Sequence, residues 1–197
     1  MGAGILPVSM HKGKLYFLFG KENKYADTPG WSDFGGGTDA GESPINTASR
    51  EAGEELTGFL GDNIKSLIRK KHLLIKNEYD GYKTYYMYII PMDYEELLPY
   101  YYNNNQRFLQ KRLPAGLIKR SKIFEKAEIK WVPMDDLVKM TPKFRVYFKE
   151  VLKKIMMRKE EIVKLFRNSS KITRRKRGAK NTRNKSVKVN IRTDNRF

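Results

Sequence analysis

The chain has 197 residues, of which 40% are hydrophobic, so one domain of ordinary size can bury a modest core. It contains no cysteine, which excludes disulfide frameworks, zinc–thiolate sites and thiol nucleophiles. Its net charge of +18 at pH 7 predicts a polyanionic partner such as nucleic acid or a polyphosphate, and no apolar run is long enough to span a membrane.

The N-terminal third predicts two strands, a loop and a helix. Apolar and β-branched residues favour strands over 2–9 and 14–22, joined by a hairpin turn. Residues 24–43 are rich in Gly, Asp and Ser and read as a loop. The next segment has strong helix signals, because Ser43 can cap, Pro44 suits the first helical position and Gly58 can end the helix.

The remainder predicts two more strands and a helical insertion. Strands are expected over 70–78 and 82–92, around a turn at 79–82. An insertion at about 94–120 contains many Tyr and Leu residues and predicts helical pieces broken at Pro99 and Pro114. It could be a substrate lid or a packed insertion.

The C-terminal part predicts a last strand, a helix and a tail. A strand is expected at 127–133, and apolar spacing predicts one amphipathic helix at about 143–166. Beyond it, residues 167–197 hold 12 Lys and Arg residues and one acidic residue. We therefore expect a domain at 1–166 and a flexible basic tail at 167–197, which either binds a polyanion or serves only solubility.

One short segment reverses the basic character of the chain. Residues 34–58 begin with glycines and hold five acidic residues: Asp39, Glu42, Glu51, Glu54 and Glu55. The last three stand at i, i+3 and i+4 of the predicted helix, so their carboxylates share one face and repel each other. Such a cluster of hard oxygen ligands predicts a bound Mg²⁺ or Mn²⁺, which in turn recruits substrate phosphates.

The spacing of this segment resembles the signature of the Nudix family. That signature is Gly-x5-Glu-x7-Arg-Glu-(aliphatic)-x-Glu-Glu-x-Gly-(aliphatic). It is matched with the same spacing by six residues: Gly36, Glu42, Arg50, Glu51, Glu54 and Glu55. Two positions depart from it: Ala52 is small for an aliphatic position, and the final glycine, Gly58, comes one residue late. The resemblance implies an α+β fold, the Nudix α/β/α sandwich with a mixed sheet and a catalytic loop-helix-loop.

The resemblance also implies roles for individual residues. Glu51, Glu54 and Glu55 would bind the divalent ion together with the Gly35 carbonyl, while Arg50 would orient the acids. A later glutamate would serve as metal ligand or general base. We expect Glu125 in that role, with Glu128 as the alternative. The implied enzyme is a metal-dependent pyrophosphohydrolase of a nucleoside-diphosphate-linked substrate.

Residues 34–58, which we call the acidic box, do not identify the substrate, so the substrate must be inferred from other residues. The insertion places Tyr100, Tyr101, Tyr102 and Phe108 near three cations, which suits base stacking and backbone binding, although these aromatic residues could instead pack a core. The cations are Arg107, Lys111 and Arg112. Trp31 and Phe34 are further candidates for stacking on a base.

Residues 1–60 are similar to compact Nudix proteins of large DNA viruses, some of which remove the messenger-RNA cap and release m7GDP. We therefore predict decapping, with capped RNA bound by the basic body and tail. The alternatives are a diphosphoinositol polyphosphate, nucleotide or dinucleotide pyrophosphohydrolase, and a non-catalytic RNA-binding module. We expect a cytoplasmic protein, in the host cell if viral, although Arg174–Arg177 also fits a nuclear signal.

Overall fold

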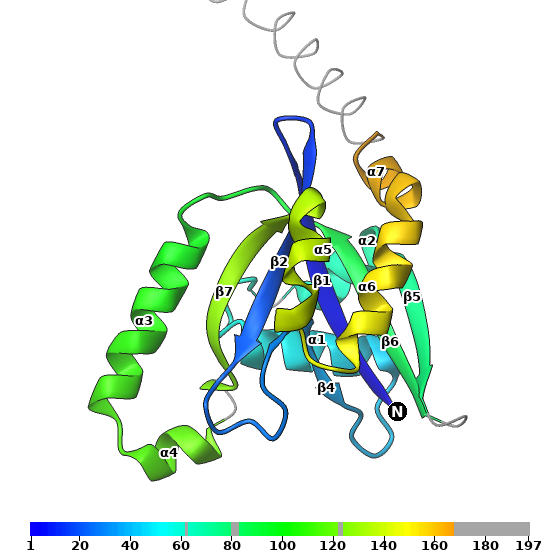
Figure 1. Cartoon of the computed structure of the whole chain (residues 1–197). Helices are drawn as coiled ribbons and strands as arrows, with labels where there is room; N and C mark the ends of the chain where they lie inside the picture. The colour runs from blue at the N-terminus through cyan, green and yellow to red at the C-terminus, as the bar shows by residue number, and fades with distance from the viewer. Residues whose placement is uncertain (62, 80–82, 122–123, 168–197) are drawn as a thin grey trace, which may run out of the picture.

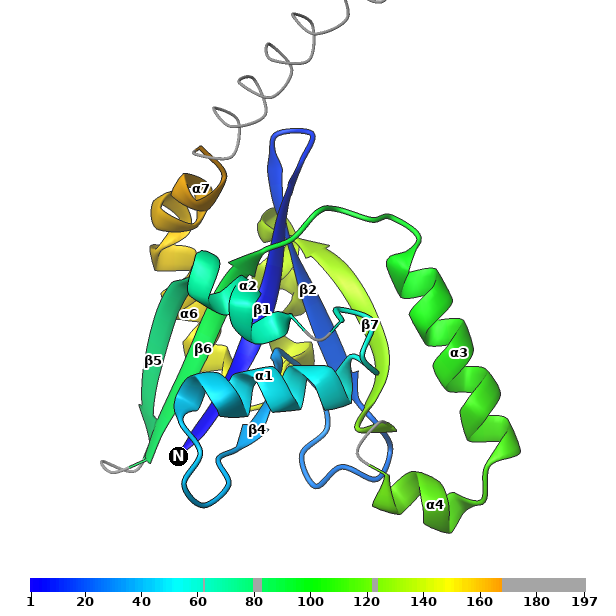
Figure 2. The same ribbon diagram turned by 180° about the vertical axis from the view of Figure 1, so that it is seen from behind.

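The computed structural model describes residues 1–61, 63–79, 83–121 and 124–167. They form a mixed seven-stranded sheet with helices on both faces (Figures 1 and 2). The predicted α+β class and α/β/α sandwich are thus confirmed. The predicted turn at 79–82 and all of the predicted tail after Arg167 lie outside the described residues, apart from Tyr79.

The sheet is built around one parallel pair. Its path is β3-β2-β1-β6-β5, and β4 and β7 add to it by pairing with β1 and β2 respectively. The β1–β6 pair is parallel and the other pairs are antiparallel. The strands are β1 (Gly2–His11), β2 (Lys14–Glu22), β3 (Trp31–Ser32), β4 (Phe34–Gly37), β5 (Leu73–Tyr79), β6 (Lys83–Pro91) and β7 (Lys126–Pro133).

The first hairpin follows directly from its turn residues. Lys12 and Gly13 have φ values of 48° and 76°, and positive φ at both central residues is what a tight two-residue hairpin turn requires. The segment predicted as a loop at 24–43 differs from expectation, because it contains the short strands β3 and β4. These strands anchor the loop to the sheet and so fix the start of the acidic segment.

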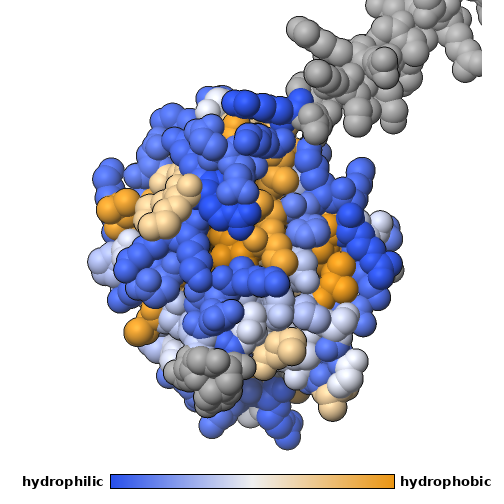
Figure 3. Space-filling model, turned by 90° about the vertical axis from the view of Figure 1, so that its right-hand side faces the viewer, coloured by the Kyte–Doolittle hydropathy of each residue, from blue (hydrophilic) through white to orange (hydrophobic). Residues whose placement is uncertain are grey.

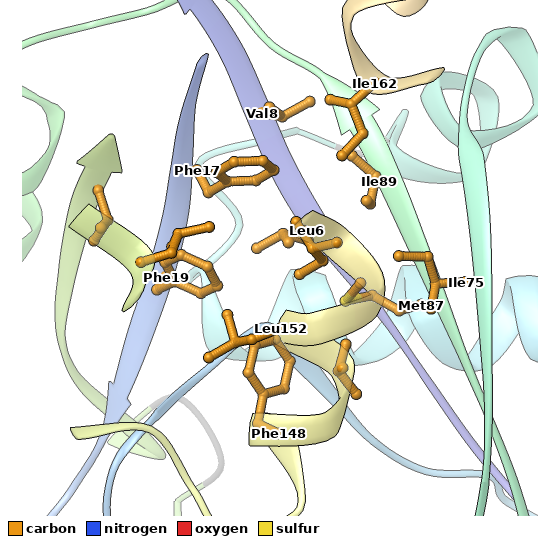
Figure 4. Close-up of a cluster of buried hydrophobic side chains, with 14 of the residues drawn as sticks. Leu6, Val8, Phe17, Phe19, Ile75, Met87, Ile89, Phe148, Leu152 and Ile162 are labelled. Carbon is orange, nitrogen blue, oxygen red and sulfur yellow. The ribbon is translucent and has the colours of Figure 1, made fainter. Parts of the chain in front are cut away.

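Helices cover both faces of the sheet because the strands bury side chains on both sides. Along β1, Ile5 faces one core cluster and Leu6 the other, as the two-residue period of a strand dictates. The cluster in Figure 4 packs β1, β2, β5 and β6 against Phe148, Leu152 and Ile162. The helices are α1 (Pro44–Glu55), α2 (Ile64–Lys70), α3 (Leu98–Arg112), α4 (Ala115–Arg120), α5 (Leu137–Met140), α6 (Phe148–Met157) and α7 (Lys159–Arg167).

The insertion is helical, with one correction to its boundaries. Pro114 separates α3 from α4, as predicted. Pro99 instead lies in the first turn of α3, where its missing N–H has no helical partner to lose. A long segment of α3 therefore runs along β7 (Figure 1).

The predicted single helix at 143–166 is two helices, α6 and α7, separated at Arg158. The Arg158 side chain donates to the Leu74 carbonyl (2.6 Å) and to Glu161 (2.8 Å), which holds the break against β5. The turn lets Ile162 and Leu165 bury in the same core as α6.

Hydrophilic residues cover most of this side of the molecule around a band of hydrophobic ones (Figure 3). None of the helices within the described residues has the length and apolarity to cross a membrane.

Two glycines make room for the hydroxyl of Tyr85 at the point where β1 pairs with β4. Gly4 and Gly35 are paired, and a Cβ on either would lie 2.2–2.3 Å from the Tyr85 hydroxyl. That hydroxyl donates to Asp33 Oδ2 at 2.9 Å, while Asp33 Oδ1 is buried without a hydrogen-bond partner in the described structure. Burial raises the pKa of Asp33 to about 6, against the lowering effect of Lys126.

The end of α1 explains the displaced glycine of the sequence pattern. Thr57 adopts φ of 51°, the left-handed conformation in which the family pattern has glycine. Its N–H bonds to the Glu54 carbonyl (3.2 Å), and the Gly58 N–H bonds to the Gly53 carbonyl (2.9 Å). These two bonds form a Schellman motif, so the helix ends as in the family pattern with threonine carrying the strain.

We predict that Thr57→Gly raises the free energy of unfolding by about 1 kcal/mol, because glycine removes the left-handed strain of an exposed β-branched residue. Urea unfolding measures it. Thr141→Gly is the control without strain relief, since Thr141 has φ of −46°; glycine there loses helix propensity and the hydrogen bond from the Thr141 hydroxyl to the Leu137 carbonyl (3.2 Å), so it should destabilise. Equal or lower stability of Thr57→Gly would show that residue 57 is unstrained.

We predict that Asp33→Asn is more stabilising at pH 7 than at pH 4. An aspartate whose folded pKa is raised from about 4 to about 6 loses about 3 kcal/mol of stability as pH rises through that window. Asparagine has no such loss. Urea unfolding in a chelating buffer at both pH values measures the difference. Asp93→Asn, at an exposed position, is the control, and a pH-independent effect at residue 33 would contradict the assignment.

Candidate active site

The acidic segment forms a loop and a helix that are tied together by one arginine. Arg50 donates from Nε and Nη2 to the two oxygens of Glu42 at 3.1 and 3.0 Å. Its Nη2 also reaches the Gly37 carbonyl at 2.9 Å, at the end of β4. The hydrogen bonds from Arg50 lower the pKa of Glu42 to about 2, so Glu42 stays ionised. Arg50 and Glu42 thereby fix the loop against the helix.

The start of α1 differs from expectation in one detail. Ser43 occupies the N-cap position, but its side chain makes no capping hydrogen bond. Its carbonyl instead accepts from the N–H groups of Asn46 and Thr47, at 2.9 and 3.0 Å. The Thr47 hydroxyl also donates to Glu42 (3.0 Å), so the first turn of the helix is held by Glu42.

Arg50 also contacts the two more N-terminal acids of the helix cluster. Its Nη1 lies 2.8 Å from Glu51 Oε1 and 3.5 Å from Glu54 Oε2. Glu51 is buried under the glycine loop, since a Cβ added at Gly36 would lie 2.7 Å from its carboxyl carbon. Position 36 therefore needs glycine for the carboxylate to approach the loop.

Glu55, the third acid, is engaged at both oxygens. Its Oε2 accepts the Gly35 N–H at 2.8 Å, and its Oε1 lies 3.1 Å from the ammonium of Lys126. The Gly35 N–H thus joins the glycine loop to the acid cluster, and the role of the Gly35 carbonyl as a metal ligand stays a prediction. Both Glu55 and Lys126 are buried.

Lys126 extends this contact into a buried charge network that the sequence did not predict. Its ammonium also bonds to Glu22, which accepts from Arg145 at 2.7 Å. Although burial alone would lower it, the carboxylates of Glu55 and Glu22 raise the pKa of Lys126 above its usual value. Lys126 is therefore a permanent ammonium between two carboxylates.

One signal for this network exists in the sequence. Glu22 ends the strand predicted over 14–22, and Lys126 directly precedes the strand predicted at 127–133. The two residues are cross-strand partners at an irregularity in the β2–β7 register. Long-range strand pairing cannot be read from the sequence, and lysine is among the residues least often buried, so the pair was missed.

A hollow of about 350 Å³ opens beside Glu55. We call it the α1 hollow. Glu125 lines the α1 hollow. Glu128 does not line it; its carboxylate is half-exposed and lies 3.5 Å from the ammonium of Lys21. The lining residues are Glu22, Asn23, Tyr25, Ala26, Asp27, Gly35, Gly36, Glu55, Lys119, Glu125 and Arg145. Carboxylates and cations therefore face one small space.

The predicted stacking residues are corrected by the structure. Phe34 is fully buried, and Trp31 is only 9% exposed and packs in the core, so neither offers a ring face to a base. Tyr102 is also buried, whereas Tyr100 and Tyr101 are exposed on α3. These aromatic rings were assigned from composition, which does not distinguish the two faces of a strand or helix.

The three predicted cations of the insertion separate into two groups. Arg107 and Lys111 line a second hollow beside α4. The Arg112 guanidinium instead lies over the ring of Phe108, with 5.5 Å between its central carbon and the ring centroid, outside both hollows. Helix α3 therefore presents only two of the three towards a cavity.

The residues fit a divalent metal ion by donor chemistry. Glu51, Glu54 and Glu55 are hard oxygen donors on one helix face, beside a glycine loop that admits close approach. Within the described ranges, however, no three acidic or histidine side chains converge closely enough to hold an ion. Arg50 lies within 3.5 Å of one oxygen each of Glu51 and Glu54, and Lys126 lies 3.1 Å from one oxygen of Glu55.

Comparison with known proteins places this geometry in a family. A search of curated proteins gives no significant match. Among solved structures, a C. elegans Ap4A hydrolase binary complex has 16% identity and a TM-score of 0.48, covering 79% of this chain and 95% of its own. The M. smegmatis Nudix hydrolase RenU has 16% identity and a TM-score of 0.47, with coverages of 82% and 86%.

The NUDIX domain of Shewanella oneidensis NrtR, complexed with ADP ribose, is similar at 15% identity, with a TM-score of 0.45 and coverages of 80% and 86%. The model of the family described as "NUDIX domain" matches residues 1–155, which is more than half of the chain. With the acidic box and its fold together in one chain, the protein belongs to the Nudix family and is a pyrophosphohydrolase.

Proposed function

We propose that the protein is a divalent-metal-dependent pyrophosphohydrolase whose substrate is capped RNA. The α1 hollow carries the catalytic part of this proposal. It brings Glu55 and Glu125 together with the cations Lys119 and Arg145 in one cavity. Carboxylates hold metal ions and accept protons, and cations bind phosphate oxygens, so the hollow offers both halves of phosphoanhydride hydrolysis.

Glu51, Glu54 and Glu55 would hold Mg²⁺ or Mn²⁺. When bound, the ion neutralises phosphate oxygens and lowers the pKa of water. The chain's own residues do the rest. Lys119 and Arg145 bind the phosphates and orient them in the hollow, and Glu125 accepts the proton of the attacking water.

The cap would stack on Tyr25, which replaces Trp31 and Phe34 in that role. Tyr25 lines the α1 hollow, and Lys24 lies over its ring at 5.0 Å from the centroid. An aromatic ring beside a cation suits a base and its attached phosphates. Support for RNA also comes from the net charge of +18.

A compact polyanion such as a diphosphoinositol polyphosphate or a dinucleotide would also be attracted by Lys119 and Arg145. A substrate panel with Mg²⁺ and Mn²⁺ therefore tests the proposal. Capped RNA should be cleaved with the highest kcat/KM, with release of m7GDP. A higher value for an inositol pyrophosphate or a dinucleoside polyphosphate would assign the smaller substrate, and RNA binding without turnover would assign a binding module. The cytoplasmic location stays a prediction.

We predict that Glu55→Gln lowers both Mn²⁺ affinity and kcat on the order of 100-fold, because a carboxylate ligand is removed. Isothermal titration with Mn²⁺ and a steady-state assay measure the two effects. Circular dichroism checks the fold, in which Lys126 keeps Glu22 as partner. Glu150→Gln, on the exposed face of α6, is the matched control. Unchanged Mn²⁺ affinity would remove Glu55 from the metal site.

We predict that Glu125→Gln lowers kcat by about 10²–10⁴-fold with little change in Mn²⁺ affinity, as expected for a general base. Its pH–rate profile should also lose the rise on the acid side. Glu128→Gln removes the same charge three residues away but from outside the α1 hollow, so its kcat should be near that of the native protein. The opposite ranking would assign the base to Glu128.

A further inference from the structure

A second hollow of about 350 Å³ lies next to the α1 hollow. We call it the insertion hollow, because α3 and α4 form most of its wall. Its charged and aromatic lining is Lys24, Tyr25, Arg107 and Lys111, and Leu113 and Ile118 are among its apolar lining residues. Its size is at the lower end of the range of about 300–1,000 Å³ typical of ligand sites.

The two hollows are adjacent. Tyr25 lines both of them, and the consecutive residues Ile118 and Lys119 of α4 line one each. A ligand that extends from the α1 hollow past Tyr25 would therefore reach the insertion hollow.

The wall between the hollows is held firmly in place. The Asn23 N–H donates to the Glu125 carbonyl (2.8 Å), and its Nδ2 donates to the Phe124 carbonyl (2.6 Å). Its Oδ1 accepts the N–H of Tyr25 (2.7 Å). Asn23 thus fixes Tyr25 to the same backbone segment that carries Glu125.

Among the described residues, no acidic side chain neutralises the cations of the insertion hollow. Arg107 and Lys111 stand at i and i+4, on one face of α3. Arg107 bonds to the Asn103 carbonyl and to the side chain of Asn104, both uncharged. In the described part of the chain no salt bridge joins Lys24, Arg107 or Lys111 to an acid. Like charges around one cavity repel, so an anionic ligand would stabilise them.

We propose that the insertion hollow binds the phosphates of the RNA chain immediately beyond the cap. This inference rests on the proposed function, since it makes the substrate a polynucleotide. A compact pyrophosphate would be satisfied by the cations of the α1 hollow, whereas a nucleotide chain continues past Tyr25. The apolar residues Leu113 and Ile118 suit the sugar and base, and the three cations suit the phosphodiesters.

The test compares two double variants that remove the same charge from the same insertion. Arg107→Ala/Lys111→Ala removes cations that line the insertion hollow. Arg112→Ala/Arg120→Ala removes exposed cations that line neither hollow. Binding is measured by fluorescence anisotropy with an uncapped 20-nucleotide RNA, and turnover with capped RNA and with the cap dinucleotide m7GpppG.

The first double variant should bind RNA about tenfold more weakly, with a salt slope lower by about two, because each of the two removed cations neutralises about one phosphate. Its KM for capped RNA should rise by a similar factor, with kcat and m7GpppG turnover unchanged. The control double variant should change RNA affinity by less than about threefold. Equal weakening in both double variants, or in neither, would overturn the subsite.

Two further outcomes separate this inference from the proposed function. Anisotropy needs no turnover, so a native protein that binds RNA through the insertion hollow but leaves capped RNA intact would overturn the substrate and not the subsite. Inorganic tripolyphosphate is the competitor. Tripolyphosphate at the same molar concentration as the RNA should leave the RNA bound. Displacement of the RNA at that concentration would show a site for compact polyanions and overturn the RNA-chain subsite.

Discussion

The contact on which the site depends is the ammonium of Lys126 between Glu22 and Glu55. A buried lysine is costly unless it is paired, and breaking a buried pair leaves an uncompensated charge. Lys126 is fully buried and is paired twice, which joins β7 to β2 and to the last turn of α1. The catalytic helix is therefore fixed to the sheet at Glu55 by charge as well as by packing. Any rearrangement that freed Glu55 would leave the buried ammonium with Glu22 alone as its described carboxylate partner.

The Lys126 contact and Arg50 together offset the repulsion between the acidic residues of α1. Three carboxylates on one face repel each other, and cations remove that repulsion. Arg50 balances Glu51 and Glu54, and Lys126 balances Glu55. A divalent ion would enter a site whose charges are already paired, so its binding must compete with these side chains for oxygens. The affinity of the proposed metal site would thus be set partly by Arg50 and Lys126.

The sequence predicted contacts between residues close together in the chain and missed contacts between residues far apart in it. The helix, its start at Pro44 and the approach of Arg50 to the acids follow from local spacing, which the helix geometry converts directly into contacts. The pairing of Glu22 with Lys126 spans 104 residues and depends on strand register, which local patterns do not contain. Trp31 and Phe34 failed as stacking residues because residue type alone does not determine which aromatic residues are buried. The helix at 143–166 failed because apolar spacing continues across the break at Arg158.

The insertion, which would bind the rest of the substrate, is attached to the catalytic helix itself. The Tyr102 hydroxyl of α3 donates to the Glu55 carbonyl at 2.6 Å and lies 3.3 Å from the Lys126 carbonyl. Asn103 makes two further bonds to Ile129 of β7, at 3.1 and 2.7 Å. The buried face of α3 is therefore hydrogen-bonded to the residues that position Glu55. Residues nearer the C-terminal end of α3, among them Arg107 and Lys111, line the insertion hollow. A ligand bound at Arg107 and Lys111, as proposed, would therefore contact a helix that is bonded through Tyr102 to the backbone of Glu55.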